Sequence, residues 1–156
     1  MPDRHDFDFL VLGSGLAGLF YALRVAEHGR VAIVTKRAAG DSATAWAQGG
    51  IAAVHADDDS FEDHHGDTLT AGAGLCHPEV VQTVVENGPH VVESLVRLGV
   101  RFDAAEAETP NGGGFALGRE GGHTRRRILH HRDATGLEIE RALLGRARSH
   151  PNIAFF

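Results

Sequence analysis

The sequence predicts an α/β fold, because an apolar run, a glycine-rich turn and a helical repeat follow one another near its start. The run from Phe7 to Leu12 is short and apolar, as in a buried parallel strand. Gly13 to Gly18 forms the turn, and apolar residues then recur at helical spacing as far as Glu27. Val31 to Thr35 is a second strand, rich in β-branched residues. This order is the βαβ unit of a doubly wound, Rossmann-like fold.

Beyond this unit the sequence predicts a helical insertion and then a last helix. Ser60 begins a helix that reaches Leu69, since Ser60 and Asp63 resemble a capping box. Pro78 begins the next helical stretch, which Asn87-Gly88-Pro89 is expected to interrupt. The other expected elements are a short strand at Val100 to Phe102, a loop at Glu106 to Gly114, a helix at Ala134 to Ser149 capped by Asp133, and a strand beginning at Asn152.

Length and composition exclude several classes of protein. The 156 residues suffice for one ordinary domain, and the net charge of −6 offers no general attraction to nucleic acid. No apolar stretch approaches the ~20 residues of a membrane span. Cys76 is the single cysteine, which rules out an internal disulfide and fits a reducing compartment. We therefore expect a cytoplasmic protein that binds neither nucleic acid nor a membrane.

The glycine motif predicts a site for the pyrophosphate of a dinucleotide. Gly13 allows the tight turn, Gly15 lets the backbone approach the phosphates, and Gly18 lets the helix pack against the strand. The helix that follows presents unpaired N–H groups and a partial positive charge to the phosphates. The identity of the nucleotide stays open, because Thr35-Lys36-Arg37 stands where an acidic residue would hold a ribose. Basic residues there suit the 2′-phosphate of NADP.

A second glycine segment favours a flavin. The side chains of residues Ser42 to Ala53 are too small for a core helix, and the segment is too apolar for an ordinary loop. Gly49-Gly50 would let backbone N–H groups point at a flat ring, as N5 and the carbonyls of a flavin require. A nicotinamide enzyme has no obvious need for this second segment, so FAD is the preferred dinucleotide.

Several longer motifs carry a family resemblance. Ala47 to Ile51 after a βαβ unit resembles the flavoprotein family of succinate dehydrogenase and fumarate reductase. Within that family, three segments resemble the L-aspartate oxidases: Asp67 to Cys76, Arg119 to His130 and Asp133 to Glu140. The resemblance implies that residues 1–156 are the N-terminal part of an FAD-binding domain, without the capping and C-terminal helical domains of the family.

The same resemblance implies FAD-dependent oxidation of L-aspartate to iminoaspartate, the first step of de novo NAD synthesis. Electrons would pass to oxygen or fumarate, and quinolinate synthase would be the downstream enzyme. The alternatives are a dicarboxylate flavoenzyme of the fumarate reductase kind and a non-catalytic dinucleotide-binding module. The FAD contacts that the motif and the resemblance imply are Gly13, Ser14, Gly15, Leu16, Ala17, Gly18, Lys36, Ala43, Thr44, Ala45, Trp46, Ala47, Gln48, Gly49 and Gly50.

Glu120 is the residue expected to recognise the substrate. A carboxylate beside the α-ammonium of aspartate favours an amino dicarboxylate over succinate or fumarate. The alternative is a structural ion pair of Glu120 with Arg125 or Arg127. Ala43 stands where family members with covalent FAD carry a histidine, so the resemblance implies noncovalent FAD.

The histidines give no further site. The spacing of His64, His65 and Asp67 does not suit a metal, so none is expected. His123 and His130 are acid–base candidates, but most histidines in proteins are surface residues or structural partners. The family's proton-transfer arginine and most of its substrate ligands come from parts that this sequence lacks. We therefore expect little or no turnover from the 156 residues alone.

Overall fold

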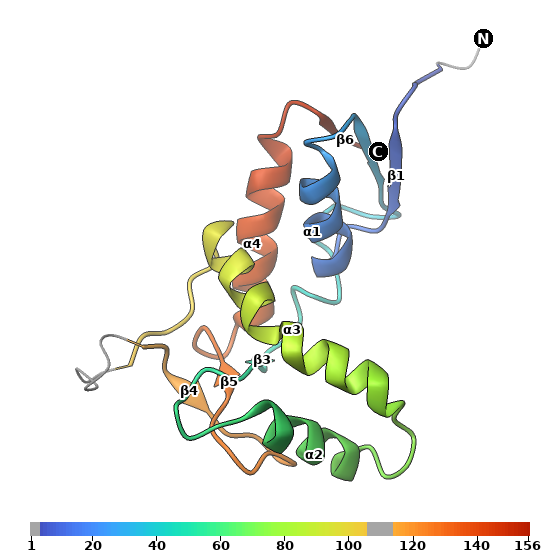
Figure 1. The fold of residues 1–156 in the computed structure, drawn as a ribbon. Helices are drawn as coiled ribbons and strands as arrows, with labels where there is room; N and C mark the ends of the chain where they lie inside the picture. Colours follow the sequence, from blue (N-terminus) through green and yellow to red (C-terminus); the bar gives the residue numbers. More distant parts are fainter. Residues whose placement is uncertain (1–3, 106–113) are drawn as a thin grey trace. The chain divides into compact units, whose positions relative to one another are not determined.

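The computed structural model describes residues 4–105 and 114–156 (Figure 1). The expected loop at Glu106 to Gly114 lies, except for Gly114, outside the described residues. The chain forms two compact units. Unit 1 comprises Met1–Gln48, Leu98–Val100 and Gly136–Phe156, and unit 2 comprises Gly49–Arg97 and Arg101–Thr135.

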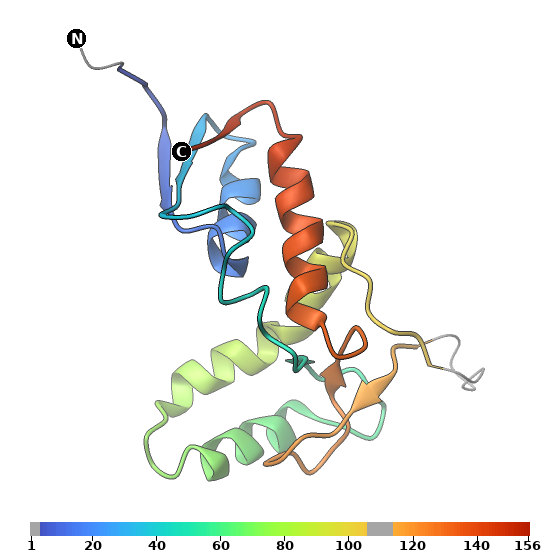
Figure 2. The ribbon, with the colours of Figure 1, turned by 180° about the vertical axis from the view of Figure 1, so that it is seen from behind.

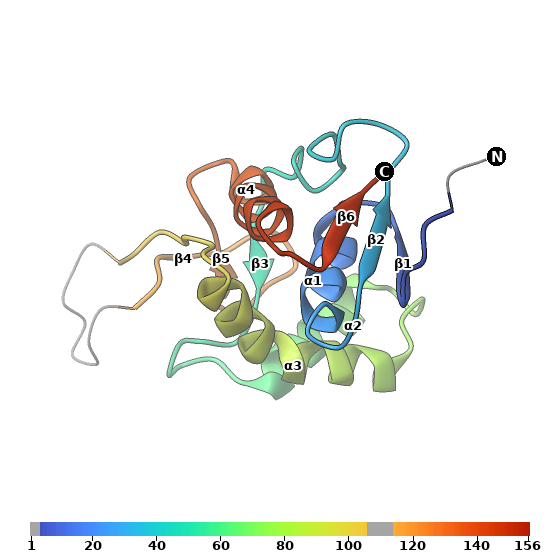
Figure 3. The same cartoon turned by 90° about the horizontal axis from the view of Figure 1, so that it is seen from above.

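Unit 1 contains the predicted βαβ arrangement. Strands β1 (Phe9–Leu12), β2 (Val31–Val34) and β6 (Ile153–Phe155) form a parallel sheet in the order β1-β2-β6. Helix α1 (Leu16–Val25) connects the first two strands, and α4 (Thr135–Arg148) precedes the third. Both helices lie on one side of the sheet (Figure 3). The α/β, Rossmann-like fold class is therefore confirmed, with the last helix within one residue of its expected bounds.

Apolar burial on one side of this sheet explains its packing. Leu19 and Ala22 of α1 and Ile33 of β2 are fully buried. On β1, Val11 is buried, whereas its neighbours Leu10 and Leu12 are 65% and 77% exposed. Because successive side chains of a strand point to opposite faces, only the face that carries Val11 is covered by α1.

Unit 2 is a helical hairpin beside a small sheet. Helices α2 (Phe61–Ala71) and α3 (Pro78–Arg97) lie side by side, as the two opposite views show (Figures 1 and 2). The short strands β3 (Ile51–Ala52), β5 (Ile128–Leu129) and β4 (Leu117–Gly118) pair antiparallel in that order. The unit's core gathers around Ala53, Val92 and Leu129, with Ile51, Phe102, Phe115 and Leu117 packed against them.

The expected interruption of the second insertion helix is wrong, because α3 runs unbroken through Pro89. A proline within a helix costs ~3 kcal/mol through one lost hydrogen bond and a clash with the preceding turn. The buried side chains of Val85, Val92 and Leu95 lie on both sides of Pro89. Each of these contributes ~1.5–3 kcal/mol on burial, so the apolar stripe outweighs the local penalty.

Two other expectations are corrected. No strand covers Val100 to Phe102; the pairing in this part of the described chain is an isolated bridge between Ala104 and Phe115. Helix α2 does begin after Ser60, whose Oγ accepts a hydrogen bond of 3.0 Å from the Asp63 N–H, but it ends at Ala71 rather than Leu69. Within residues 4–105 and 114–156, no helix has both the length and the apolar character to span a membrane.

Candidate functional site

The turn after β1 has the geometry that close approach to a phosphate requires. Gly13 has a φ of +102°, a left-handed conformation that side chains rarely adopt. A Cβ on Gly18 would overlap the carbonyl oxygen of Gly13, so α1 packs against the turn only because Gly18 has no side chain. Gly15 is the N-cap of α1 and offers no capping side chain. The start of the helix is therefore left for groups from elsewhere.

One such group is the hydroxyl of Thr44. The backbone N–H of Leu16 donates a hydrogen bond of 2.9 Å to Thr44 Oγ1, which partners the first turn of α1 from 28 residues away. The Thr44 hydroxyl keeps its own hydrogen and can donate it to an anion at the same helix end. Ser14 has a different role: its buried hydroxyl donates to the carbonyl oxygen of Ala39 at 2.7 Å. The hydroxyl hydrogen of Ser14 is thus already used, so only the backbone N–H of Ser14 can donate to a phosphate.

Helix α4 supports the segment that carries Thr44. The Gly136 N–H donates to the Ala47 carbonyl at 3.0 Å, and a Cβ on Gly136 would overlap the Thr44 carbonyl oxygen. Further along the helix, Glu140 Oε2 accepts a 3.0 Å hydrogen bond from the Ser42 hydroxyl. Burial raises the pKa of Glu140, against the smaller lowering effect of the Ser42 bond.

Neither Gly136 nor Glu140 was a predicted site residue, and one signal pointed to the first of them. A glycine near the start of a helix costs stability relative to alanine, so it indicates a close approach. No sequence signal connects Glu140 with Ser42, because the two are 98 residues apart.

A hollow of about 520 Å³ opens at the end of β2, where a ribose lies in doubly wound folds. Lys36 and Arg37 line it, and Arg37 Nη1 pairs with Asp41 at 3.2 Å. Its other lining residues are Thr35, Ala39, Arg148, Phe155 and Phe156. The predicted residue Lys36 therefore borders a space in unit 1 that is open to a ligand.

Unit 2 brings Glu120 beside the second glycine segment. A Cβ on Gly49 would lie 3.4 Å from Glu120 Oε1, and one on Gly50 would overlap the Leu129 carbonyl oxygen. Glu120 is exposed, and its side-chain carboxylate has no hydrogen bond or ion pair with any described residue. Among the other predicted residues of the segment, Ala43, Trp46, Ala47 and Gln48 are exposed, and Thr44 and Ala45 are half-buried.

The alternative structural role of Glu120 is wrong, because the neighbouring arginines pair with aspartates. Arg125 lies 3.4 Å from Asp63, on the surface. Arg127 is fully buried and bonds to Asp59 and Asp67 at 2.7 and 2.6 Å. Glu120 therefore keeps a carboxylate that no cation among the described residues neutralises.

The two candidate histidines are engaged in structural contacts. His123 Nδ1 lies 3.2 Å from Arg127 Nη1, and His130 Nδ1 lies 3.2 Å from Asp103. A backbone hydrogen bond from Arg132 outweighs burial and, with His131 and His130, holds the pKa of Asp103 low. No cluster of metal ligands occurs in the part of the chain that the structure describes.

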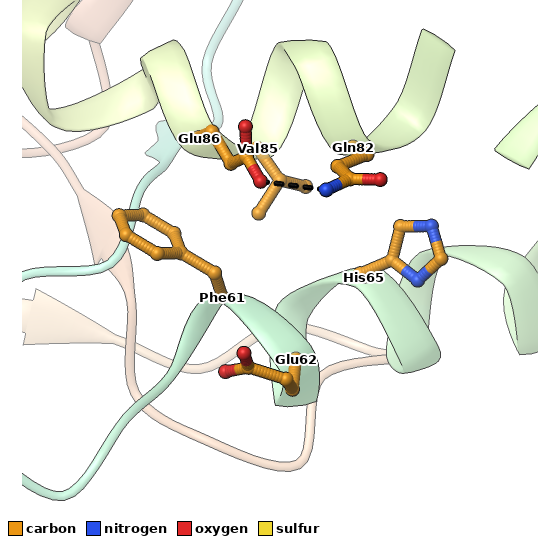
Figure 4. Close-up of a pocket in the computed structure, with 6 residues that line it drawn as sticks. All are labelled: Phe61, Glu62, His65, Gln82, Val85 and Glu86. Atoms are coloured by element: carbon orange, nitrogen blue, oxygen red, sulfur yellow. Dashed lines mark hydrogen bonds between the residues drawn. The ribbon is translucent and has the colours of Figure 1, made fainter. Parts of the chain in front are cut away.

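Two further hollows lie within unit 2. One, of about 230 Å³ between α2 and α3, is lined by Phe61, Glu62, His65, Gln82, Val85 and Glu86 (Figure 4). Gln82 and Glu86 bond to each other across its edge at 2.8 Å, and no predicted site residue lines it. The other, of about 360 Å³, lies between the end of α2 and the turn that follows Glu120. Only the second borders the candidate site.

A profile of the FAD binding domain family matches residues 8–156. L-aspartate oxidase 2-a of Nicotiana tabacum is 51% identical over 150 residues, which are 96% of this chain and 22% of the relative. L-aspartate oxidase of Yersinia pestis is 48% identical over 151 residues, 97% of this chain and 28% of the relative. The chain thus spans about a quarter of the length of the curated relatives it matches.

Solved structures show the same fold. A quinol fumarate reductase FrdA from E. coli has a TM-score of 0.85 and 31% identity, covering 96% of this chain and 25% of its own. Sdh1 of Mycobacterium smegmatis has a TM-score of 0.82 and 33% identity, covering 99% of this chain and 28% of its own. Together with the family match, these relatives indicate FAD as the cofactor.

Proposed function

The chain belongs to the FAD binding domain family, and we propose that it serves FAD-dependent oxidation of L-aspartate to iminoaspartate. One observation carries this proposal: the unpaired carboxylate of Glu120 lies beside Gly49, in the segment proposed to face the flavin. The relatives near 50% identity are named L-aspartate oxidases, which agrees with this substrate.

The residues of unit 1 fit the dinucleotide. The start of α1 and the Thr44 hydroxyl offer hydrogen-bond donors to a pyrophosphate, and Lys36 offers a positive charge beside the hollow after β2. Ala43 has no nucleophilic side chain, so we propose noncovalent FAD. The proposed contacts are Gly13, Ser14, Gly15, Leu16, Ala17, Gly18, Lys36, Ala43, Thr44, Ala45, Trp46, Ala47, Gln48, Gly49 and Gly50.

Glu120 would select the substrate by its charge. Bound FAD supplies the acceptor for the hydride that leaves the substrate carbon. A carboxylate next to the α-ammonium of aspartate forms a charge-assisted hydrogen bond that succinate and fumarate cannot make. Holding the ammonium at one point also fixes which hydrogen of the substrate faces the acceptor. Glu120 therefore orients aspartate as well as selecting it.

Oxygen or fumarate is the proposed electron acceptor, and quinolinate synthase the proposed consumer of iminoaspartate. The cytoplasmic location expected from the sequence stays a prediction; some plant relatives are named chloroplastic.

The experiment uses the natural polypeptide that contains this chain, loaded with FAD, and the variant Glu120→Gln. We expect the KM for L-aspartate to rise about tenfold or more, since a hydrogen bond to a charged group contributes ~1.5–3 kcal/mol. Fumarate reduction should keep its KM. Glu86→Gln makes the same change on α3, away from Gly49, and should leave both KM values unaltered. An unchanged KM for aspartate in Glu120→Gln would remove Glu120 from the site.

The second candidate is a dicarboxylate flavoenzyme, favoured by the similarity to fumarate reductase and succinate dehydrogenase structures. It predicts that succinate reduces the flavin and that Glu120→Gln has no effect. The unpaired carboxylate of Glu120 argues against it, because succinate and fumarate carry no ammonium group that would pair with this carboxylate.

A further inference from the structure

We propose that Arg127 is a positioning residue, which holds the turn that carries Glu120 and thereby sets the recognition of aspartate. This inference rests on the proposed function. The residues concerned all belong to unit 2, where Arg127 stands just before β5 and Glu120 just after β4.

The turn begins at Glu120 itself. The His123 N–H donates to the Glu120 carbonyl oxygen at 3.3 Å, which closes a four-residue turn over Gly121 and Gly122. Gly122 has a φ of +86°, as the third position of a type II turn requires. The orientation of Glu120 therefore depends on the conformation of this turn.

Two side chains, those of Asp67 and Arg127, form hydrogen bonds with the residues at the end of the turn. Asp67 Oδ2 accepts hydrogen bonds from the backbone N–H and the hydroxyl of Thr124, at 2.8 and 2.9 Å. Arg127 Nη1 lies 3.2 Å from His123 Nδ1. Because arginine can only donate, Nδ1 of His123 must accept, so the proton of the neutral ring is on Nε2.

Arg127 connects the turn to the residues at and before α2. Its guanidinium donates two hydrogen bonds of 2.8 and 2.7 Å to Asp59 and one of 2.6 Å to Asp67. Asp59 lies just before α2 and Asp67 within it, so the helix serves as the support. The side chains of Arg127 and Asp59 are fully buried, and removing one of them would leave a buried charge without its partner.

The hydrogen bonds around Asp67 favour its ionised form. Burial alone would raise the pKa of Asp67, but the bonds from Thr124 and Arg127 lower it to about 2. Asp67 is therefore ionised at neutral pH and accepts from both partners at the same time.

Lysine cannot replace this arrangement. Its ammonium is a compact charge without the planar fork that engages Asp59, Asp67 and His123 together. Arg125, two residues away, provides a contrast. Its side chain is 45% exposed and pairs with Asp58 and Asp63 at 3.8 and 3.4 Å, and among the described residues it has no hydrogen bond to the turn. Arg127→Lys and Arg125→Lys are thus the same change with different expected effects.

The test measures KM in the FAD-loaded natural polypeptide for both lysine variants. We expect Arg127→Lys to raise the KM for L-aspartate about tenfold and to leave the KM for fumarate unchanged. Arg125→Lys should change neither. Added to Glu120→Gln, Arg127→Lys should have little further effect, because residues that act as one unit are not additive. Equal increases for aspartate and fumarate, or additive effects, would overturn the positioning role.

A gentler variant covers the case in which Arg127→Lys fails to fold. Thr124→Val removes one bond to Asp67 and leaves the buried ion pairs, so the KM for aspartate should rise a few-fold. Thr83→Val, whose hydroxyl bonds only within α3, is its control. If Thr124→Val raised the KM for aspartate no more than Thr83→Val does, the proposal would be contradicted.

Hydrogen exchange separates this inference from the proposed function. In Arg127→Lys the amides of residues 119–124 should exchange faster, whereas those of α3 should keep their rates. This result holds even if the wild-type polypeptide does not oxidise aspartate, an outcome that would reject the function alone. Unchanged exchange at residues 119–124 would reject the positioning role.

Discussion

Replacing Gly136 by alanine tests whether α4 supports the proposed flavin segment. The new Cβ would overlap the Thr44 carbonyl oxygen and would lie 2.8 and 2.9 Å from the carbonyl oxygen and Cβ of Ala47. These atoms belong to backbone or to a short side chain, so the segment and the helix must move apart.

The cost follows from the contacts. Overpacking of this kind costs ~1–3 kcal/mol. The movement also breaks the Gly136–Ala47 hydrogen bond, which contributes ~0.5–1.5 kcal/mol. Alanine recovers up to ~1 kcal/mol of helix propensity. A net loss of about 2 kcal/mol corresponds to a fall in Tm of about 4–8 °C for a chain of this size.

Gly145→Ala is the matched control, because it lies in the same helix and its added Cβ meets no atom within 4 Å. It should raise Tm by about 2–4 °C through helix propensity alone. Thermal unfolding followed by circular dichroism measures both, and titration with FAD should show about tenfold weaker binding for Gly136→Ala only. A Gly136→Ala variant that melts at or above wild type would refute the packing argument.

Two pH-dependent predictions follow from buried carboxyls. Asp67 has a folded pKa of about 2 against 3.8 unfolded, so its ~2 kcal/mol of stabilisation is present above about pH 4 and is lost as the pH falls towards 2. Asp67→Asn should flatten this acid limb in urea unfolding, and an unchanged slope would contradict the assignment. The pKa of Glu140 is raised above 4.5, so its folded state favours the protonated form and stability falls as the pH rises from 4.5 through the folded pKa. Glu140→Gln should therefore raise Tm at pH 8 and leave it nearly unchanged at pH 4, whereas Glu140→Ala should lower it at both by removing the partner of Ser42.

The parts of the fold that local pattern determines were predictable. The βαβ unit follows from residues 7–35, because strand, glycine turn and helix are adjacent in the chain. The capping of α2 by Ser60 and the end helix α4 also follow from short-range signals. The interruption at Pro89 was wrong because a local penalty was weighed without the burial of Val85, Val92 and Leu95.

The candidate site shows the same division. Gly13, Gly18 and Gly49-Gly50 are visible in the sequence because their spacing is local. The contact of Thr44 with Leu16 and that of Gly136 with Ala47 join distant segments, so only the fold reveals them. The Glu120 carboxylate is unpaired because Arg127 pairs instead with Asp59 and Asp67, which are 68 and 60 residues away from it in the chain. No local pattern in the sequence predicts which acidic residues Arg127 pairs with.

The most direct test of the proposed function is anaerobic mixing of the FAD-loaded natural polypeptide with L-aspartate or with succinate, followed by flavin absorbance. If Glu120 binds the α-ammonium, L-aspartate should bleach the flavin and succinate should not. The Glu120→Gln variant should then need a much higher concentration of aspartate for the same absorbance change. Bleaching by succinate but not by L-aspartate would contradict the account.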